Sequence, residues 1–370
     1  MTFGEKMRAL MAERGISLRR LARETFDDVG HLSRVSRDLK PPSEELARAL
    51  DGILHADGEL LALAKVSPTR LALNGSLTPD EEERLRLAIN RPSRLDAAVI
   101  ESLETILAVQ RRTEDSIGSW PLVEPVRAQV LAIEGMVTEA SGPLRKPLLD
   151  VAAQWAQFAG WLHTSSGHQT RALEYFSRTL EWATEVGDQE LVGVVMSWKG
   201  YVADKRGQIG PMIGMSQAAQ QLRRSVGRVY DFYQEARGHA VLGDAAEVDR
   251  LTELAAQEAA EIRPETSRPW EYYYFAPGFF TLEHGVTYRI LGRTDPARNG
   301  DAVELLSAGL RELPEDMRGS EWAGDFVYQL GRAYQQAGEH GEAAKVAAEL
   351  DAMARPIGSK RLVRLAAELR

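Results

Sequence analysis

Cysteine is absent from the 370 residues of this chain. That absence excludes disulfides, thiolate metal sites and cysteine nucleophiles, and it is compatible with a reducing compartment. Long apolar runs are missing too: no stretch reaches the roughly 18 residues of a membrane-spanning helix. The first residues, MTFGEK, lack the basic and apolar regions of a signal peptide. The sequence therefore predicts a soluble, cytoplasmic protein.

Motifs that carry catalysis are also missing. The chain has no GxxxxGKS/T phosphate loop, no GxGxxG, no HExxH and no GxSxG. Paired acids such as those at residues 81–83 stand at expected helix starts, where they interact favourably with the helix dipole. We therefore expect no enzyme, no cofactor and no metal site.

Basic residues are outnumbered by acidic ones overall, 45 to 54, but they are in excess at one end. Residues 1–40 hold nine Lys/Arg against six Asp/Glu, and residues 1–66 hold eleven of each. The whole net charge of −9 therefore falls in residues 67–370. A chain that coats nucleic acid would carry the opposite sign. The distribution fits a protein whose DNA contacts are confined to its first residues.

The first forty residues have the pattern of a helix-turn-helix. Ser17 can cap one helix, and Asp28 can cap a second after a short turn at residues 25–27. In the second helix, Leu32 and Val35 are expected to point inward. Two short helices in this order form the unit that inserts its second helix into the DNA major groove. An ordinary helical hairpin is the alternative.

Three motifs strengthen the first interpretation. They are the LxxLA of residues 18–22, the GxLSRV of residues 30–35 and the KPPSxELARALD of residues 40–51. With these motifs, residues 1–66 resemble the XRE (Cro/repressor-like) helix-turn-helix family of actinobacterial regulators. The sequence departs from the family pattern at Val29, Ser36 and Asp38.

The resemblance implies DNA contacts from exposed residues of the second helix and its flanks. The expected DNA-binding residues are Gly30, His31, Ser33, Arg34, Arg37, Lys40 and, on the preceding helix, Arg19. Among these, Arg34 is the best candidate for a phosphate or base contact. Asp27 and Asp28 suit the macrodipole of the second helix but repel phosphate. They support the alternative that this head no longer binds DNA strongly.

The rest of the chain is expected to be helical. Ser43 can cap a fourth helix that runs to Ile53, and Asp57 begins a fifth, from Gly58 to Lys65. Proline, glycine, asparagine and serine make residues 67–80 the expected linker. From there, residues 81–370 form a helical connecting region followed, from about residue 150, by repeats. The predicted fold is thus all-α, with a five-helix DNA-binding domain at residues 1–66 followed by an α-solenoid.

An internal repeat underlies the solenoid prediction. Five times, a small residue is followed seven positions later by a glycine that ends a helical run: Gly160/Gly167, Gly200/Gly207, Ala236/Gly243, Gly285/Gly292 and Gly331/Gly338. The small residue lets a second helix approach closely, and the glycine closes the first helix with a positive φ. These positions resemble the tetratricopeptide repeat, whose stacked helix pairs form a concave surface. Two further segments, AQWAQFAGWL at residues 153–162 and RLDAAVIESL at residues 94–103, add to this pattern. With them, the chain resembles actinobacterial XRE regulators with a helical-repeat body.

Aromatic residues are few, 7% of the chain, but cluster at residues 270–280. Some of these rings must enter the core while others can face a ligand. The candidate ligand-binding residues are Trp270, Tyr273 and Tyr274, with Trp155, Trp198 and Tyr201 expected on the same concave side. A purely structural role in the core is the alternative for each.

Together these features predict a transcriptional regulator. The head would bind operator DNA as a homodimer, and the repeat body would supply dimer contacts, sense a peptide or small-molecule effector, or both. The alternative is a protein-interaction scaffold with a head that has lost strong DNA binding.

Overall fold

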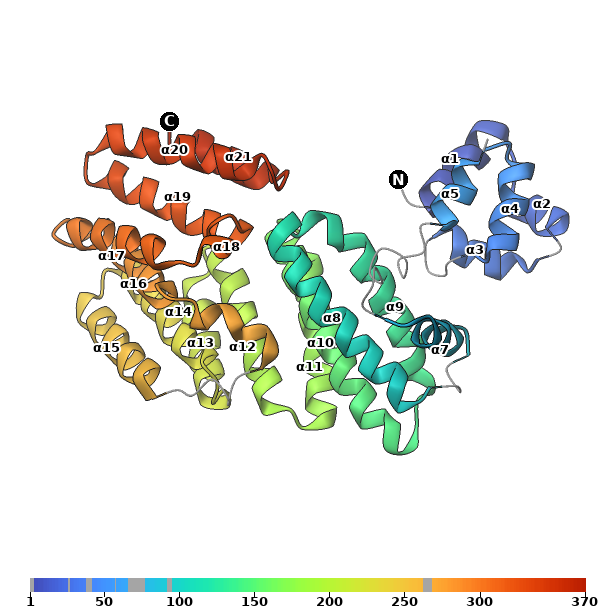
Figure 1. The fold of residues 1–370 in the computed structure, drawn as a ribbon, viewed down its shortest axis with the longest axis horizontal. Helices are drawn as coiled ribbons and strands as arrows, with labels where there is room; N and C mark the ends of the chain where they lie inside the picture. The colour runs from blue at the N-terminus through green and yellow to red at the C-terminus, as the bar shows by residue number, and fades with distance from the viewer. Residues whose placement is uncertain are drawn as a thin grey trace. The chain divides into compact units, whose positions relative to one another are not determined.

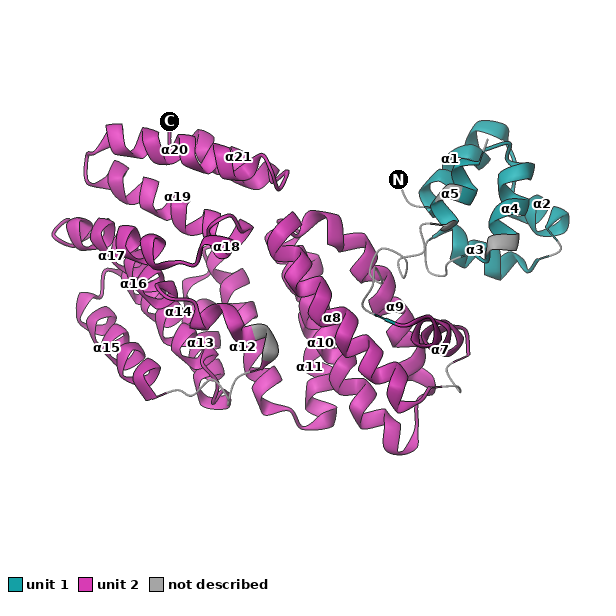
Figure 2. Cartoon of the chain, viewed as in Figure 1, with its two compact units in different colours: residues 1–77 teal, residues 78–370 magenta. Residues whose placement is uncertain are grey.

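The computed structural model describes residues 3–25, 27–37, 42–56, 58–65, 77–91, 95–261 and 268–370. Within these ranges every regular element is a helix and no strand occurs, so the expected all-α class is confirmed (Figure 1). None of the described helices is both long and apolar enough to cross a membrane. The chain divides into two compact units, residues 1–77 and 78–370 (Figure 2).

The described residues of the first unit form five helices. They are α1 (Phe3–Arg14), α2 (Leu18–Glu24), α3 (Val29–Ser36), α4 (Glu44–Ile53) and α5 (Glu59–Lys65). Their shared core contains Met7, Leu21, Leu32, Leu50 and Leu60, each completely buried.

Side-chain caps set three of these helix starts. Ser17, Asp28 and Ser43 each accept a hydrogen bond from the backbone N–H three residues further along, at 3.3, 2.8 and 3.1 Å. Each bond satisfies a donor that has no partner inside the helix. The three expected caps are thereby confirmed, whereas Asp57, expected to start α5, lies outside the described residues.

The expected linker, residues 67–80, lies for the most part outside the described residues, which resume at Leu77. The second unit opens with a capping box in which the hydroxyl of Thr78 and the carboxylate of Glu81 exchange hydrogen bonds with each other's backbone N–H. Its first helices are α7 (Pro79–Asn90), α8 (Ala97–Ile117), the short η2 (Trp120–Leu122) and α9 (Val123–Glu139).

Antiparallel helix pairs follow. The pairs are α10 (Arg145–Ser165) with α11 (Gln169–Val186), α12 (Gln189–Lys205) with α13 (Ile209–Leu222), α14 (Gly227–Leu242) with α15 (Ala245–Glu261), α16 (Phe279–Leu291) with α17 (Arg298–Glu312), and α19 (Glu321–Gln336) with α20 (His340–Ala354). The short helix η3 (Gly142–Leu144) precedes the first pair, η5 (Pro269–Phe275) connects α15 to α16, and α18 (Glu315–Arg318) connects α17 to α19. The last helix is α21 (Lys360–Glu368).

Each expected small-residue and glycine pair falls at the end of the first helix of a helix pair. The close approach is real: a Cβ on Gly160 would overlap the ring of Phe176 in α11. Four of the five closing glycines have positive φ, but Gly292 has φ −60°, so the conformational prediction is wrong there. A side chain at Gly292 is excluded instead by packing, since its Cβ would overlap the side chain of Asn299.

The two ends of the second unit meet. The backbone N–H of Ser119, just after α8, donates to the carboxylate of Glu321 at the start of α19, at 3.2 Å. Ser359 donates to the other oxygen of the same carboxylate at 2.7 Å. Figure 1 shows α8 approaching α18 and α19 at this point. Helices that are some 200 residues apart thus close around an interior space.

Candidate functional sites: a partly open cavity and an arginine-bearing helix surface

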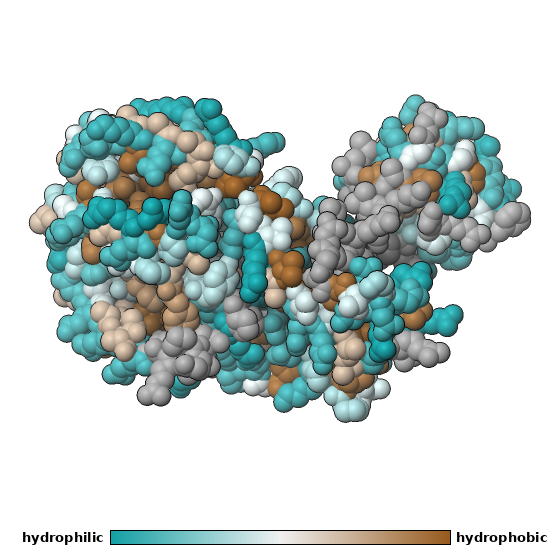
Figure 3. All heavy atoms as spheres, viewed as in Figure 1, coloured by the Kyte–Doolittle hydropathy of each residue, from teal (hydrophilic) through white to brown (hydrophobic). Residues whose placement is uncertain are grey.

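The second unit contains a partly open cavity of about 510 Å³. Ligand pockets of proteins usually have about 300–1,000 Å³. Apart from Arg223, which directly follows α13, the lining residues come from α8, from the first helix of each pair, from η5 and from Arg293 just after α16. On the face drawn in Figure 3, hydrophobic residues of this unit reach the surface in several separate areas. The cavity is therefore the candidate ligand site of this unit.

A helix position repeated in each pair points to the cavity. The residue directly after the small residue of each repeat lines it: Trp161, Tyr201, Arg237, Val286 and Arg332. The residue two positions before the small residue also lines it in four repeats: Phe158, Trp198, Glu283 and Gln329. At about 100° per residue, these two positions lie about 100° and 160° around the helix from the small residue. The small residue faces a packed helix, so this other face is left for the cavity.

Aromatic rings form much of the wall. Trp161 and Trp198 have ring centroids 4.8 Å apart, and Tyr201 meets Trp198 edge-on at 5.6 Å. From η5, Tyr273 packs against Tyr274 at 4.4 Å and against Trp322 of α19 at 6.4 Å. Such rings offer large apolar faces to a ligand, and the tyrosine hydroxyls add hydrogen-bonding groups.

Four of the candidate ligand-binding residues come together here. Trp198, Tyr201, Tyr273 and Tyr274 all line the cavity. Trp155 does not: it is completely buried, and its indole N–H donates to the carbonyl oxygen of Leu103 at 3.1 Å. It faces the packing between α8 and α10, so its placement on the concave side is corrected. The side chain of Trp270 lies outside the described part of the structure.

Charged side chains, which the sequence did not single out, line the cavity as densely as the rings. The cationic ones are Arg111, Lys205, Arg223, Arg237, Arg289, Arg293 and Arg332. The acidic ones are Glu114, Asp115, Asp204, Glu271, Glu283 and Asp325. Part of this set could have been predicted from the sequence. The signal is a charged residue at the repeated position described above in an otherwise apolar first helix.

Most of these charges are neutralised locally. Arg237 forms an ion pair with Glu283 and donates to the hydroxyl of Tyr230 at 3.1 Å. Because the pair is buried, the carboxylate keeps the pKa of Arg237 above its ordinary value.

Arg223 is the centre of a second buried network. Its guanidinium contacts Asp231 at 3.3 Å, Glu190 at 3.3 Å and also Glu271, which belongs to η5. Ser225 donates to both glutamates, at 2.6 and 2.8 Å. The network ties η5, and with it the aromatic wall, to α12 and α14.

Glu114 is a buried acid of α8 and lies in the wall that this helix gives to the cavity. Burial raises its pKa to about 7, while a hydrogen bond from the hydroxyl of Ser119 acts in the other direction. Its neighbour Asp115, also raised by burial, has a pKa of about 6 and accepts a hydrogen bond from Tyr272. Near neutral pH this wall therefore takes up or releases protons.

The first unit offers a different surface, on α2 and α3. Arg19, Arg34 and Arg37 are exposed, and Gly30 and the half-buried Ser33 lie on the same helix as Arg34. Arg19 and Arg34 form no ion pair within the described residues. Lys40, the remaining cation of the expected DNA-binding set, lies outside the described residues.

His31 is held inward by its own helix start. Its Nδ1 lies 2.8 and 2.9 Å from the carboxylate oxygens of Asp27, and its Nε2 is buried without a hydrogen-bond partner. In this conformation the imidazole does not present a free nitrogen to solvent. The expectation that His31 is an outward-facing member of the set is therefore corrected.

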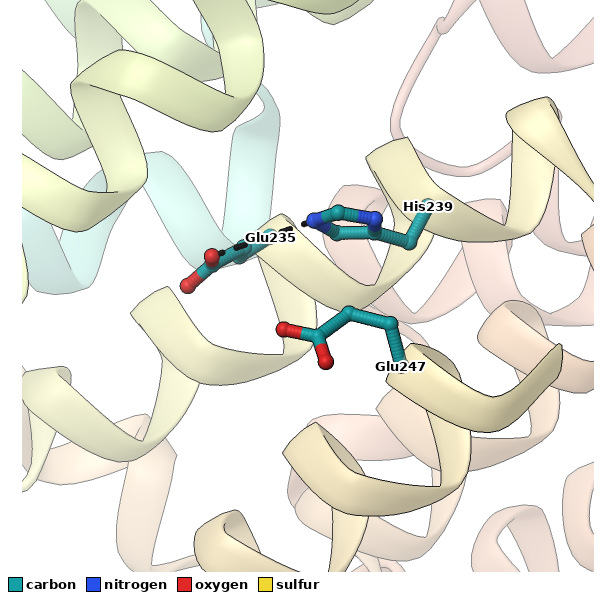
Figure 4. Close-up of side chains that lie close together, drawn as sticks. All are labelled: Glu235, His239 and Glu247. Atoms are coloured by element: carbon teal, nitrogen blue, oxygen red, sulfur yellow. Dashed lines mark ion pairs between the residues drawn. The ribbon is translucent and has the colours of Figure 1, made fainter. Parts of the chain in front are cut away.

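A cluster of possible metal ligands lies on α14 and α15 (Figure 4). One ligand atom each from Glu235, His239 and Glu247 lies within 4.8 Å of the others. Gln217 and Gln220 already donate to the two carboxylate oxygens of Glu235, at 2.7 and 2.6 Å. Glu247 is held by the guanidinium of Arg250. The carboxylates thus have protein partners, whereas Nδ1 of His239 is buried without a hydrogen-bond partner among the described residues.

The chain was compared with known proteins. No family model matches it, and no curated protein is similar to it at a significant level. Its function must therefore be inferred from the chemistry of the cavity and of the arginine-bearing helix surface.

Proposed function

We propose that this chain is a sequence-specific, DNA-binding transcriptional regulator whose second unit binds an effector in its cavity. The first unit acts as an XRE-like helix-turn-helix domain, with α3 as the helix that enters the major groove. The protein works as a homodimer, because a single small head makes too few contacts for useful affinity.

The observation that carries the DNA-binding part is the two-sided character of α3. Leu32 and Val35 are buried in the core of the unit, while Arg34 and Arg37 are exposed on the other side. Asp28 caps the helix, which fixes the orientation of its first turn. Guanidinium groups on a rigid helix are suited to phosphates and to guanine edges.

The sensing part of the proposal rests on the cavity. Its walls come from α8, from the first helices of the helix pairs and from η5, and α8 and α19 meet at Ser119 and Glu321. The proposal treats these pairs as a tetratricopeptide-like solenoid. A ligand that prefers one curvature of the solenoid would shift the population toward it. In a dimer, that change alters the spacing of the paired heads and so their affinity for an operator.

A second function, a protein-interaction scaffold, is favoured by one observation. Asp27 and Asp28 place two carboxylates at the N-terminus of α3, and phosphate would be repelled there. In this alternative the head does not bind DNA strongly, and the solenoid binds a protein partner.

The experiment that tests the proposal is recovery of bound fragments from genomic DNA by the purified protein. We expect a short inverted repeat with the wild type and its loss with Arg34→Ala. Arg364→Ala, which removes an exposed arginine of α21, is the matched control and should retain the enrichment. Binding that has no sequence preference, or that survives Arg34→Ala unchanged, would refute the DNA-binding role and favour the scaffold. The affinity for the recovered repeat should also fall steeply with salt.

A further inference from the structure

We propose that Arg289, Arg293 and Arg332 form the binding site for an anionic group, carboxylate or phosphate, of a ligand whose apolar body lies between the aromatic walls of the cavity. This inference deepens the proposed effector-binding role and rests on it. It names the chemistry that the cavity selects.

The three arginines share one wall. Arg289 and Arg293 are four residues apart at the end of α16, and all three line the cavity. The amide of Gln336 in α19 donates to the carbonyl oxygen of Arg289 at 2.9 Å, so the two helices are held together at this level. Arg332 lies four residues before Gln336 and therefore on the same side of α19.

Arg289 is buried without a partner for its charge. The side chain is only 6% exposed, and its Nε has no hydrogen-bond partner in the described part of the chain. None of the three arginines forms an ion pair with a described residue. An unpaired buried guanidinium is costly, and buried charges in proteins are nearly always paired.

The nearby carboxylates are engaged elsewhere. Glu283 is paired with Arg237, and Asp325 is paired with Arg361. Asp204 is the remaining acid on this side of the cavity, next to Lys205, whose ammonium lies 4.7 Å from the ring centre of Tyr201. One carboxylate and one ammonium compensate each other, so the arginine wall keeps its positive charge.

The pKa of Arg289 agrees with a wall of unpaired positive charge. Burial, and then the like charges of Arg293 and Arg332, lower its pKa to about 10. The opposing influences of Tyr328 and Asp204 are smaller. A bound anion would offset the burial of this charge, because it pairs with the guanidinium groups. It would also cancel the repulsion among the three arginines.

The rest of the cavity indicates to what kind of molecule the anionic group belongs. A volume of about 510 Å³ exceeds the needs of an inorganic ion, and the walls next to the arginines include Tyr328 and Phe326. Gln329, three residues before Arg332, has a buried side-chain oxygen without a donor. The ligand class that satisfies these groups is an amphipathic acid with a hydrogen-bond donor near its anionic group.

The test uses the full chain and matched probes. N-acetylphenylalanine carries a carboxylate, an aromatic ring and an N–H donor, and its amide differs only in lacking the charge. We expect calorimetric titration to show that the wild type binds the acid about tenfold or more tightly than the amide. Arg332→Gln should abolish this preference, and Arg364→Gln, an exposed site on α21, should keep it.

Inorganic phosphate distinguishes the two anion types. Competition of phosphate with the acid would mean that the wall accepts either group, and its failure to compete would restrict the ligand to carboxylates. Equal affinity for acid and amide, retention of the preference in Arg332→Gln, or no binding of acid or phosphate by the wild type would each overturn the proposal.

Thermal unfolding without ligand gives an independent readout. Removing one of three repelling charges should raise the Tm of Arg332→Gln by about 2 °C, whereas an arginine that merely supports the fold would lower it when removed. None of these measurements involves DNA. Loss of anion binding would therefore leave the operator test untouched, and failure of the operator test would leave the anion site intact.

Discussion

Glu114 shows how one buried side chain makes the cavity wall sensitive to pH. The carboxyl group is 7% exposed, and burial raises its pKa from 4.5 to about 7. Because the pKa in the folded state lies above that of the unfolded chain, the folded protein binds the proton more tightly. The contribution of this group to stability is thus fully present below about pH 4.5 and is lost as the pH rises through 7.

We expect Glu114→Gln to remove this pH dependence. Between about pH 5.5 and about pH 8.5, the wild type should lose on the order of 2 kcal/mol of unfolding free energy through Glu114. Glutamine keeps an oxygen that accepts from Ser119 and cannot ionise. Urea unfolding at both pH values measures the difference, and Glu101→Gln, an exposed site on α8, should behave like the wild type. A variant with the same loss as the wild type would contradict the assignment.

Among the elements, η5 is tied to distant parts of the chain. It is held by Glu271, whose carboxylate meets Arg223 at the end of α13. Arg223 is 2% exposed and fits only because two neighbouring residues have no side chain: a Cβ on Gly227 would overlap its guanidinium, and one on Gly193 its Cγ. These glycines are required for packing, since no left-handed backbone is involved.

Gly227→Ala is therefore expected to displace Arg223 and to break the network. Separation of a buried ion pair costs about 3–5 kcal/mol, and we expect a loss of this order in the unfolding free energy. Gly214→Ala is the matched control, because Gly214 lies in α13 with open space around it. The control should gain up to about 1 kcal/mol from better helix propensity. Comparable stability of the two variants in chemical denaturation would refute the role of Arg223.

At the scale of the whole molecule, the contact between α8 and α19 closes the second unit. Glu321 accepts hydrogen bonds from Ser119 and Ser359 and lies 3.4 Å from Arg361. One carboxylate thus joins the start of the unit, the start of α19 and the start of α21.

Glu321→Ala should loosen this closure without unfolding the unit. We expect amide hydrogen exchange to become about tenfold faster or more in residues 111–122 and 318–330, because local opening loses its main opposing contact. Exchange in α14 and α15 should stay unchanged. Glu342→Ala, which removes an exposed partner of Lys345, should leave all four regions as in the wild type. Uniformly faster exchange would instead indicate general destabilisation.

Features that are determined within a few residues of the chain could be predicted from the sequence. Features that depend on residues far apart in the chain could not. The caps at Ser17, Asp28 and Ser43 were predictable because the bonds span three residues. Trp155 and Trp161 lie in one helix, yet the first is core and the second lines the cavity. Which of the two side chains lines the cavity depends on the helices that pack against α10. No local sequence pattern encodes that packing. The DNA-contact set, corrected only at His31, stays a prediction.

The sequence by itself determined the all-α class, the helix pairs and the close approaches at their small residues. These features follow from backbone propensity, capping and side-chain size, which act within a few residues. Only the tertiary structure decided that a cavity exists, that aromatic rings from α12 and η5 share it, and that three arginines face it without an ion-pair partner among the described residues. Pairing and burial of charge depend on groups far apart in the chain, such as Arg223 with Glu271, and these meet only when the helices have packed.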